Sequence, residues 1–279
     1  MKILYVYDSY PSTYQKYLVS LLYALKLKIN VKTLVYVKDK KANYSIKRYG
    51  FSDLLQNFKF KLGFSKYKSI DLNYFFDFDI IHVQHSYLWR KLEPLKQFKK
   101  HPKIIITLRG GDTYIKPWLS KSWQNFYKNS EHVTAFVVMS NHQKEYLHKK
   151  WDVPSSKIYV IPISFGEKSI APPKYPNPDS LKLVSAFRMT WEKNIEGSIQ
   201  IAKKLKEQNI NFEYDIYGDG SDLGELYYLI DRYSLQENVF PKGKIDNELL
   251  KDRLLNYDFF VQLSISESLG MSVVEAQSL

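Results

Sequence analysis

The stretch YDFFVQLSISESLGMSVVEAQSL, residues Tyr257–Leu279, predicts the unit around which the rest of the chain is organised. Its apolar run Phe259–Leu263 is short and flanked by polar residues, as is typical of a buried strand. A serine-rich turn follows, and Gly270 allows the backbone to turn sharply into a helix that begins near Met271. The sequence therefore predicts a strand, a loop and a helix N-terminus.

The predicted helix N-terminus is suited to binding an anion. Its unpaired N–H groups, near Leu269, Gly270 and Met271, and the positive end of its dipole would face an anion above the carboxyl end of the strand. Glu267 and Glu275 bracket this turn, with seven residues between them. Two glutamates at that spacing alone are more often a solvated pair beside a buried strand, so the surrounding sequence decides whether they form a binding site.

That context is the pattern S-x-x-E-x-x-G-x-x-x-x-E-A, which begins at Ser264. It resembles the donor-site motif of family 4 of the retaining glycosyltransferases, which have the GT-B fold. The resemblance implies that Glu267 is a catalytic residue facing the donor sugar and that Glu275 accepts hydrogen bonds from the ribose hydroxyls. It also implies that Ser264 and the loop amides line the diphosphate site. Ser268 stands where the family usually has glycine, which alters the approach of this loop to the phosphates.

Length and composition fit a globular protein of one large or two moderate domains, with 279 residues of which 44% are apolar. The absence of cysteine excludes disulfides and thiolate metal sites. The run Ile3–Tyr7 is too short, and too soon followed by Asp8, for a signal peptide, and no stretch approaches the length of a membrane span. We therefore expect a cytoplasmic protein.

The chain is strongly basic, with 41 Lys and Arg against 29 Asp and Glu and a net charge of +12. This balance favours anionic partners: nucleic acid, an acidic membrane surface or phosphorylated substrates. The lysines crowd most between Lys38 and Lys68, where aromatic residues are interleaved with them. A peripheral contact with an anionic membrane and a plain solvated face explain this segment about equally well. Nucleic-acid binding rests on charge alone, and we expect no nucleic-acid partner.

The chain opens with a strand at Ile3–Tyr7, a helix at Tyr14–Leu27 and a strand at Val31–Val37, which together form a βαβ unit. The turn at 8–13 has no glycine, so the dinucleotide fingerprint of a Rossmann dehydrogenase is missing. Many family 4 enzymes have a glycine-rich turn here. This departure puts in doubt the family's backbone contact from the turn to the donor phosphates or the acceptor.

The next strand, Asp79–His85, ends in polar residues and resembles a histidine-containing strand of the same family. We interpret His82, within the strand, as a core histidine, whereas His85 at the carboxyl end is a candidate for the acceptor side of the cleft. Neither has an acidic or cysteine partner at a metal-ligand spacing, so we expect no bound metal and no cofactor.

A strand at Lys103–Leu108 ends in Arg109, Gly110, Gly111 and Asp112, where two glycines allow close approach of a ligand. The resemblance implies an R-G-x-D version of the family's cleft sequence, with Arg109 as a catalytic-site cation and the next three residues on the acceptor side. A guanidinium stays protonated, so Arg109 is assigned no acid–base role. The alternative is a plain Gly-Gly turn with Arg109 and Asp112 paired on the surface.

Further strands are predicted at Thr134–Met139 and Ile158–Ile161, with Ser140 as a helix N-cap after the first of them. The run Pro162–Asp179 contains five prolines and no periodicity, so we interpret it as a linker between two domains. The alternation of strands and helices restarts after it.

The second half begins with a strand at Leu181–Phe187 and a loop, Arg188–Asn194, that leads into a helix. This loop resembles the family's R-x-x-x-x-K-G sequence, which implies that Arg188 and Lys193 bind the donor diphosphate. Asn194 replaces the usual glycine.

Two later strands carry glycines that the resemblance assigns to the donor site. Phe212–Tyr217 is followed by Gly218, and Val239–Lys244 contains Gly243, which borders the family's base pocket. A helix at Asn247–Leu255 then leads into the stretch quoted first.

Together these features predict an α/β protein of the GT-B fold, with two Rossmann-like domains facing across a cleft. Residues 1–165 are the expected acceptor-side domain, and residues 180–279 are the expected donor domain. The resemblance implies transfer of a sugar, with retention, from a UDP- or GDP-linked donor to a glycan or lipid-linked acceptor, as in cell-surface polysaccharide synthesis. The alternative is a non-catalytic nucleotide-sugar-binding or scaffold subunit of a polysaccharide assembly complex.

The helix predicted after Gly270 reaches Leu279 without a Gly, Asn or Pro stop signal. Without further strands, the second sheet would keep an open edge that its neighbours should cover. We therefore expect that the second domain is incomplete, and that the reading frame continues or a separate chain supplies the rest.

Overall fold

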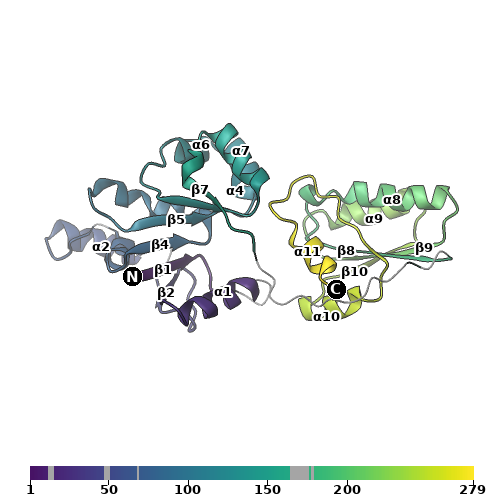
Figure 1. The fold of residues 1–279 in the computed structure, drawn as a ribbon, viewed down its shortest axis with the longest axis horizontal. Helices are drawn as coiled ribbons and strands as arrows, with labels where there is room; N and C mark the ends of the chain where they lie inside the picture. Colours follow the sequence, from purple (N-terminus) through teal and green to yellow (C-terminus); the bar gives the residue numbers. More distant parts are fainter. Residues whose placement is uncertain (12–15, 47–50, 68, 164–175, 177–178) are drawn as a thin grey trace. The chain divides into compact units, whose positions relative to one another are not determined.

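The structure of the protein is a computed structural model that describes residues 1–11, 16–46, 51–67, 69–163, 176 and 179–279. It contains two compact units: unit 1 is Met1–Ser164 and unit 2 is Phe165–Leu279. Each unit is a parallel sheet with helices packed on it (Figure 1). The boundary falls inside the linker predicted at Pro162–Asp179, most of which lies outside the described residues.

The described part of unit 1 holds a seven-stranded parallel sheet in the order β3-β2-β1-β4-β5-β6-β7. Its strands are β1 Lys2–Tyr7, β2 Asn30–Val35, β3 Tyr44–Ser45, β4 Ile80–Val83, β5 Lys103–Thr107, β6 Ala135–Val138 and β7 Ile158–Val160. The strand order reverses at β1. The chain passes from β1 toward β2 on one side and from β4 toward β5 on the other, although β1 and β4 are neighbours. In open parallel sheets, ligands bind in the crevice at the carboxyl ends of such a strand pair.

Two clusters of buried side chains fix the helices of unit 1 on this sheet. From α1 (Lys16–Lys26), Leu18 and Leu22 pack on one face, against side chains of β1 and β2. Leu4 and Val6 belong to the other face, which α3, α6 and α7 cover. The remaining helices of the described part are α2 Phe51–Lys61, α3 Ile70–Phe75, α4 Gly111–Tyr114, α5 Lys116–Leu119, α6 Lys121–Lys128 and α7 Asn141–Trp151, with 3-10 helices η2 Ser86–Lys91, η3 Glu93–Gln97 and η4 Ser155–Lys157.

The described part of unit 2 holds four parallel strands in the order β10-β9-β8-β11, which reverses at β8. Figure 1 shows α8 and α9 over one face of this sheet and α10 on the other. Ile199 of α8 and Leu226 of α9 pack with Tyr214, whereas Leu250 of α10 packs with Val184. The elements are β8 Leu181–Ala186, η5 Trp191–Lys193, α8 Ile195–Glu207, β9 Phe212–Tyr217, α9 Leu223–Arg232, β10 Val239–Gly243, α10 Asn247–Leu254, β11 Phe259–Phe260 and α11 Met271–Gln277.

The alternation of strands and helices predicted from the sequence is confirmed in both units. Ser140 is the predicted N-cap of α7, and its hydroxyl accepts a hydrogen bond from the Gln143 N–H at 3.2 Å. Parts of three predicted features lie outside the described residues: the turn at 8–13, the start of the first helix and the basic segment near 47–50 and 68. None of the described helices has the length and apolarity that a membrane crossing requires.

The predicted buried strand at Phe259–Leu263 is wrong in its length and in its burial. Only Phe259 and Phe260 pair as a strand, and the Phe259 side chain is 46% exposed. β11 lies at the edge of the described sheet, where β8 is its neighbour on one side. An edge strand has one flank without a partner strand, so its apolar side chains stay partly accessible.

His132 is a polar residue whose ring nitrogens are buried without a hydrogen-bond partner among the described residues. Burial, reinforced by the Lys96 cation, lowers the pKa of this imidazole from 6.5 to about 4. Between pH 6.5 and 4, His132 therefore stays neutral in the folded chain, whereas it already binds a proton in the unfolded chain. Protonation of His132 in the unfolded chain therefore lowers the free energy of unfolding as the pH falls from 6.5 toward 4, and it has little effect above pH 6.5.

We expect His132→Leu to raise the free energy of unfolding at pH 7 by about 1–3 kcal/mol, the usual penalty of a buried unsatisfied polar group. The variant should also lose part of the decline in stability between pH 6.5 and 4. Urea unfolding over this pH range measures both effects. His148→Leu is the control, because His148 Nδ1 contacts the Val153 carbonyl at 2.9 Å and its loss should destabilise. If the stability of His132→Leu had the same pH dependence as that of the unchanged protein, His132 would not be the cause of the decline.

Candidate functional site

The loops that follow β8 and β11 meet at one edge of the unit 2 sheet, because these strands are parallel neighbours. The Ile265 N–H donates to the Glu192 carbonyl at 2.8 Å, which joins the two loops through their backbones. The Asn194 side-chain amide donates to the Leu263 carbonyl at 3.1 Å. This edge is the reversal point of the strand order, where an open parallel sheet binds its ligand.

Lys193 and Glu267, predicted separately from two motifs, form an ion pair with each other. Glu267 also accepts a hydrogen bond from the Gln262 amide at 2.8 Å, and the Ser272 hydroxyl donates to the Gln262 side-chain oxygen. A cation, a carboxylate and two polar side chains are thus linked across the loop between β11 and α11. The sequence analysis did not single out Gln262 or Ser272. The available signal was a polar Gln262 late in an otherwise apolar run.

Arg188 differs from Lys193 in its environment. Its side chain is exposed, and its Nη2 lies 3.1 Å from Glu192 Oε1 in a surface ion pair. Such pairs stabilise a fold by little, so the guanidinium is available to exchange its partner for an incoming anion. Both predicted diphosphate cations therefore stand at the carboxyl end of β8, each with a carboxylate partner.

Asn194 explains how the chain tolerates the loss of the family's usual glycine. Its backbone is left-handed, with φ of 55°. Asparagine is one of the few residues other than glycine that visits this region at low cost. Its side-chain oxygen also accepts a hydrogen bond from the Gly197 N–H at 3.0 Å, which caps α8. The substitution therefore keeps the loop geometry and adds a cap.

Gly218 is required by a close backbone contact. A Cβ at this position would lie 1.9 Å from the Phe187 carbonyl oxygen, and one at Gly220 would lie 2.1 Å from the Met189 carbonyl oxygen. The loop after β9 therefore packs directly on the loop after β8, which begins with Arg188. The Gly218 N–H also donates to the Gly243 carbonyl at 2.8 Å. Contact of Gly218 or Gly243 with a donor stays a prediction.

We expect Gly218→Ala to destabilise unit 2 by several kcal/mol, about 3 or more, because the new methyl group overlaps a backbone oxygen that cannot move freely. Gly224→Ala is the matched control, since nothing lies within 4 Å of a Cβ there. Gly224 is in α9, so alanine should stabilise it by about 0.5–1 kcal/mol. Urea unfolding of the two variants tests the contact, and equal stabilities would rule it out.

The loop between Ser264 and Met271 has polar groups without internal partners. The backbone N–H groups of Leu269, Gly270 and Met271 donate no hydrogen bond within the described residues, whereas those further along the helix bond to the Gly270 carbonyl. The Ser264 hydroxyl is buried and likewise has no partner in the described part of the chain. Gly270 itself is left-handed, with φ of 67°. The loop therefore presents donors that a ligand could use.

Glu275 lies further along α11, on the side that faces α10. Burial raises the pKa of its carboxyl group, and the Lys251 cation of α10 opposes that shift. The structure thus places Glu275 beside α10, in a partly buried environment. Its predicted contact with ribose hydroxyls stays a prediction.

In unit 1, Arg109 is held in a fixed orientation at the carboxyl end of β5. Its guanidinium donates to the Tyr17 hydroxyl at 2.8 Å, to the Gln84 side-chain oxygen at 2.9 Å and to the Gln84 carbonyl at 3.3 Å. Gln84 follows β4, so Arg109 reaches the reversal point of this sheet as well. The guanidinium plane also lies over the Tyr17 ring, 5.4 Å from its centroid.

Asp112 is buried and does not pair with the Arg109 guanidinium, so the alternative of a surface ion pair is wrong. Its carboxylate accepts hydrogen bonds from the backbone N–H groups of Arg109 at 3.1 Å and Gly110 at 3.0 Å, and from the Ser86 hydroxyl. Gly110 has φ of 111°, which favours glycine, and Gly111 begins α4. In this structure Asp112 therefore fixes the turn that carries Arg109.

The two histidines of the strand predicted at Asp79–His85 have different roles. His82 is largely buried, its Nε2 lies 2.8 Å from the Thr107 hydroxyl, and burial lowers its pKa to about 3. The prediction of a core histidine is confirmed. His85 Nδ1 accepts a hydrogen bond from the Asp8 N–H at 3.1 Å, so the neutral ring carries its proton on Nε2. His85 thus lies between the ends of β1 and β4.

Among the described residues, no group of three or more His, Asp or Glu side chains is arranged to hold a metal ion. That the protein needs no metal stays a prediction.

Two family models match the chain: "Glycosyltransferase Family 4" over residues 34–163 and "Glycosyl transferases group 1" over residues 167–279. Two curated relatives are UDP-N-acetylglucosamine–peptide N-acetylglucosaminyltransferase GtfA subunits. That of Streptococcus parasanguinis is 26% identical over 163 residues, 55% of this chain and 31% of the relative. That of Limosilactobacillus reuteri is 28% identical over 184 residues, 62% of this chain and 35% of the relative. The chain thus spans about a third of their length.

A solved structure of Anabaena Alr3699/HepE, in complex with UDP and glucose, has the same fold. The TM-score is 0.69 at 14% identity, covering 99% of this chain and 78% of that chain. Two Rossmann-like units with ligand sites at their strand reversals define the GT-B class. The chain has this fold, and the family models that match its two parts both describe glycosyltransferases.

Proposed function

We propose that the chain transfers a sugar, with retention of configuration, from a UDP- or GDP-linked donor to a glycan or lipid-linked acceptor. The observation that carries the proposal is the Lys193–Glu267 pair at the strand reversal of unit 2. A cation for a diphosphate and a carboxylate for a sugar are the two groups that a nucleotide-sugar site needs side by side.

In this proposal, the charge that develops on the leaving diphosphate is stabilised by Arg188 and Lys193. The free N–H groups between Leu269 and Met271 add donors to the same anion, and Ser264 supplies a hydroxyl. Glu275 accepts hydrogen bonds from the ribose hydroxyls, and Gly218 and Gly243 lie beside the nucleotide base. Donor binding would thus be shared between fixed cations and backbone dipoles.

In this proposal, Glu267 of unit 2 acts on the donor sugar, and the acceptor-side residues belong to unit 1. Arg109 is a fixed cation in this proposal, held by Tyr17 and Gln84, and its role is to stabilise negative charge without exchanging a proton. His85, Gly110 and Gly111 contribute to the acceptor side, while Asp112 acts through the turn that it holds.

The relatives support UDP as the nucleotide, since the GtfA subunits are named for UDP-N-acetylglucosamine and the Anabaena structure is a complex with UDP. A lipid-linked acceptor would bring the enzyme to a membrane, and we include a peripheral contact with an anionic membrane in the proposal. A role in cell-surface polysaccharide synthesis and a cytoplasmic location stay predictions.

We expect Arg188→Ala and Lys193→Ala each to weaken UDP binding by about 1.5–3 kcal/mol, the range of a hydrogen bond to a charged group. This corresponds to roughly a ten- to hundredfold rise in Kd. Isothermal calorimetry with UDP and GDP measures it. Lys182→Ala is the control, because Lys182 is an exposed residue near the opposite end of β8. Unchanged affinity in both Arg188 and Lys193 variants would remove the diphosphate site from the proposal.

We expect transfer to persist in EDTA, because Arg188, Lys193 and the loop amides supply the positive charge that a metal supplies in other transferases. Turnover of UDP-sugars with and without the chelator, followed by addition of manganese or magnesium, is the measurement. Loss of turnover that either metal restores would count against the proposal.

The second candidate is a non-catalytic nucleotide-sugar-binding or scaffold subunit. It is favoured by the names of the curated relatives, which are described as subunits. Donor hydrolysis and transfer, assayed over a panel of UDP- and GDP-sugars, separate the two candidates. A purified chain that binds a nucleotide-sugar donor but neither hydrolyses nor transfers its sugar would support the non-catalytic subunit.

A further inference from the structure

The outward side of α2 is apolar, whereas a surface helix usually turns polar residues outward. At 3.6 residues per turn, Leu54, Leu55, Phe58 and Leu62 fall within an arc of roughly 100°. These residues, with Phe64, are named the α2 face. Leu54 is 69%, Phe58 is 58% and Leu62 is 53% exposed, and Phe64 in the following turn is 80% exposed. Isolated exposed apolar side chains are ordinary, but such a group marks a contact surface.

Lysines border the α2 face on both sides. By the same helical spacing, Lys61 lies next to Leu54 and Lys59 lies next to Leu55. Lys66 follows the helix, and the segment 54–66 contains no Asp or Glu. Lysine stems lie along apolar surface while their ammonium groups reach outward, so this arrangement suits an apolar layer covered by anionic groups.

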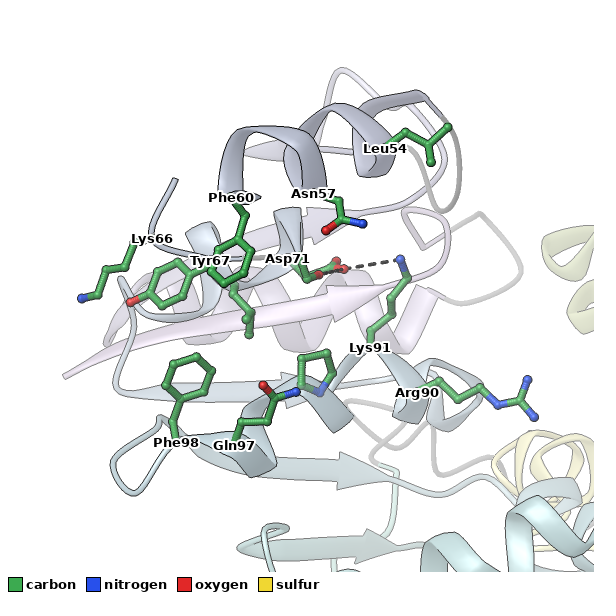
Figure 2. A pocket seen from close by; sticks show the side chains of 13 residues that line it. Leu54, Asn57, Phe60, Lys66, Tyr67, Asp71, Arg90, Lys91, Gln97 and Phe98 are labelled. Carbon is green, nitrogen blue, oxygen red and sulfur yellow. Dashed lines mark hydrogen bonds and ion pairs between the residues drawn. The ribbon is translucent and has the colours of Figure 1, made fainter. Parts of the chain in front are cut away.

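A pocket of about 520 Å³ adjoins the α2 face, between α2, α3 and the 3-10 helices η2 and η3 (Figure 2). Leu54 of the α2 face lines it together with Phe60, so the pocket and the face adjoin at Leu54. The other apolar lining residues are Tyr67, Leu72, Pro94 and Phe98. The pocket therefore continues the exposed apolar surface into the body of unit 1.

The polar groups of this pocket favour a negatively charged ligand with hydroxyl groups. Asp71 is neutralised by Lys91, at 3.4 Å, which leaves Lys66 and Arg90 as the other charged groups in the lining. The Asn57 side-chain oxygen is buried and has no hydrogen-bond partner among the described residues. Figure 2 shows Asn57 pointing from α2 into this space. A hydroxyl would satisfy it, while an anion would meet Lys66 or Arg90.

We propose that the α2 face and its pocket form a docking site for an anionic lipid bilayer whose head groups carry hydroxyls, such as phosphatidylglycerol. Phe58, Leu62 and Phe64 enter the boundary between head groups and acyl chains, the lysines contact phosphates, and one head group occupies the pocket. The inference deepens, and rests on, the membrane contact in the proposed function. Its test measures lipid binding alone, so it can fail while sugar transfer stands.

The test is sedimentation of the full chain with vesicles of phosphatidylcholine alone or with phosphatidylglycerol. We expect binding to the anionic vesicles that weakens as salt is added, and little binding to the neutral ones. Phe58→Ser with Leu62→Ser should lower the vesicle partition coefficient at least about tenfold. The matched control is Tyr227→Ser with Tyr228→Ser, two exposed aromatic residues on α9. Circular dichroism checks that both variants stay folded.

Two further variants separate charge from the pocket. Lys59→Gln with Lys61→Gln should reduce binding to anionic vesicles and weaken its salt dependence. Asn57→Leu should reduce the preference for phosphatidylglycerol over phosphatidylserine, and soluble glycerol phosphate should not release the bound chain. Equal binding to neutral vesicles, or equal loss in the α9 control, would overturn the proposal. So would release by glycerol phosphate, or a dimer in gel filtration that the Phe58 and Leu62 changes dissociate.

Discussion

Parallel pairing at a strand reversal is the constraint on which both sites depend. In unit 2, Phe260 lies opposite Val184 in register, so the chain leaves β8 and β11 at the same edge. Lys193 from one loop and Glu267 from the other can then form an ion pair across 74 residues of sequence. In unit 1, β1 and β4 have the same relation, and Asp8 meets His85 there.

The sequence predicted the architecture well because it depends on short-range patterns, and the structure brings together two of the predicted charged groups, Lys193 and Glu267. Strand and helix alternation follows from periodicity, and Lys193 and Glu267 each stand in a recognisable local motif. His82 could be assigned to the core because it lies within an apolar run. The cap at Ser140 likewise depends on a residue only three positions away.

The remaining features depend on contacts between distant segments, which a single sequence does not reveal. The close contact of Gly218 with the Phe187 carbonyl joins two loops, and the motif that assigns Gly218 to the donor site does not reveal it. The hydrogen bond that the buried Asp112 accepts from Ser86 also joins separate segments, and the motif that assigns Asp112 to the acceptor side does not reveal it. The exposure of Phe259 follows from the position of β11 in the sheet rather than from its composition.

If the chain has the proposed function, the Lys193–Glu267 pair influences which ligands the donor site can distinguish. When Lys193 turns to a phosphate, Glu267 keeps the Gln262 amide but loses its cation, and a partly buried carboxylate without compensation is costly. A sugar hydroxyl can replace the lost contact, whereas a bare nucleoside diphosphate has none to offer there. An intact donor would therefore be favoured over its own spent product, and a site built on exchange of partners would release the nucleotide once the sugar has gone.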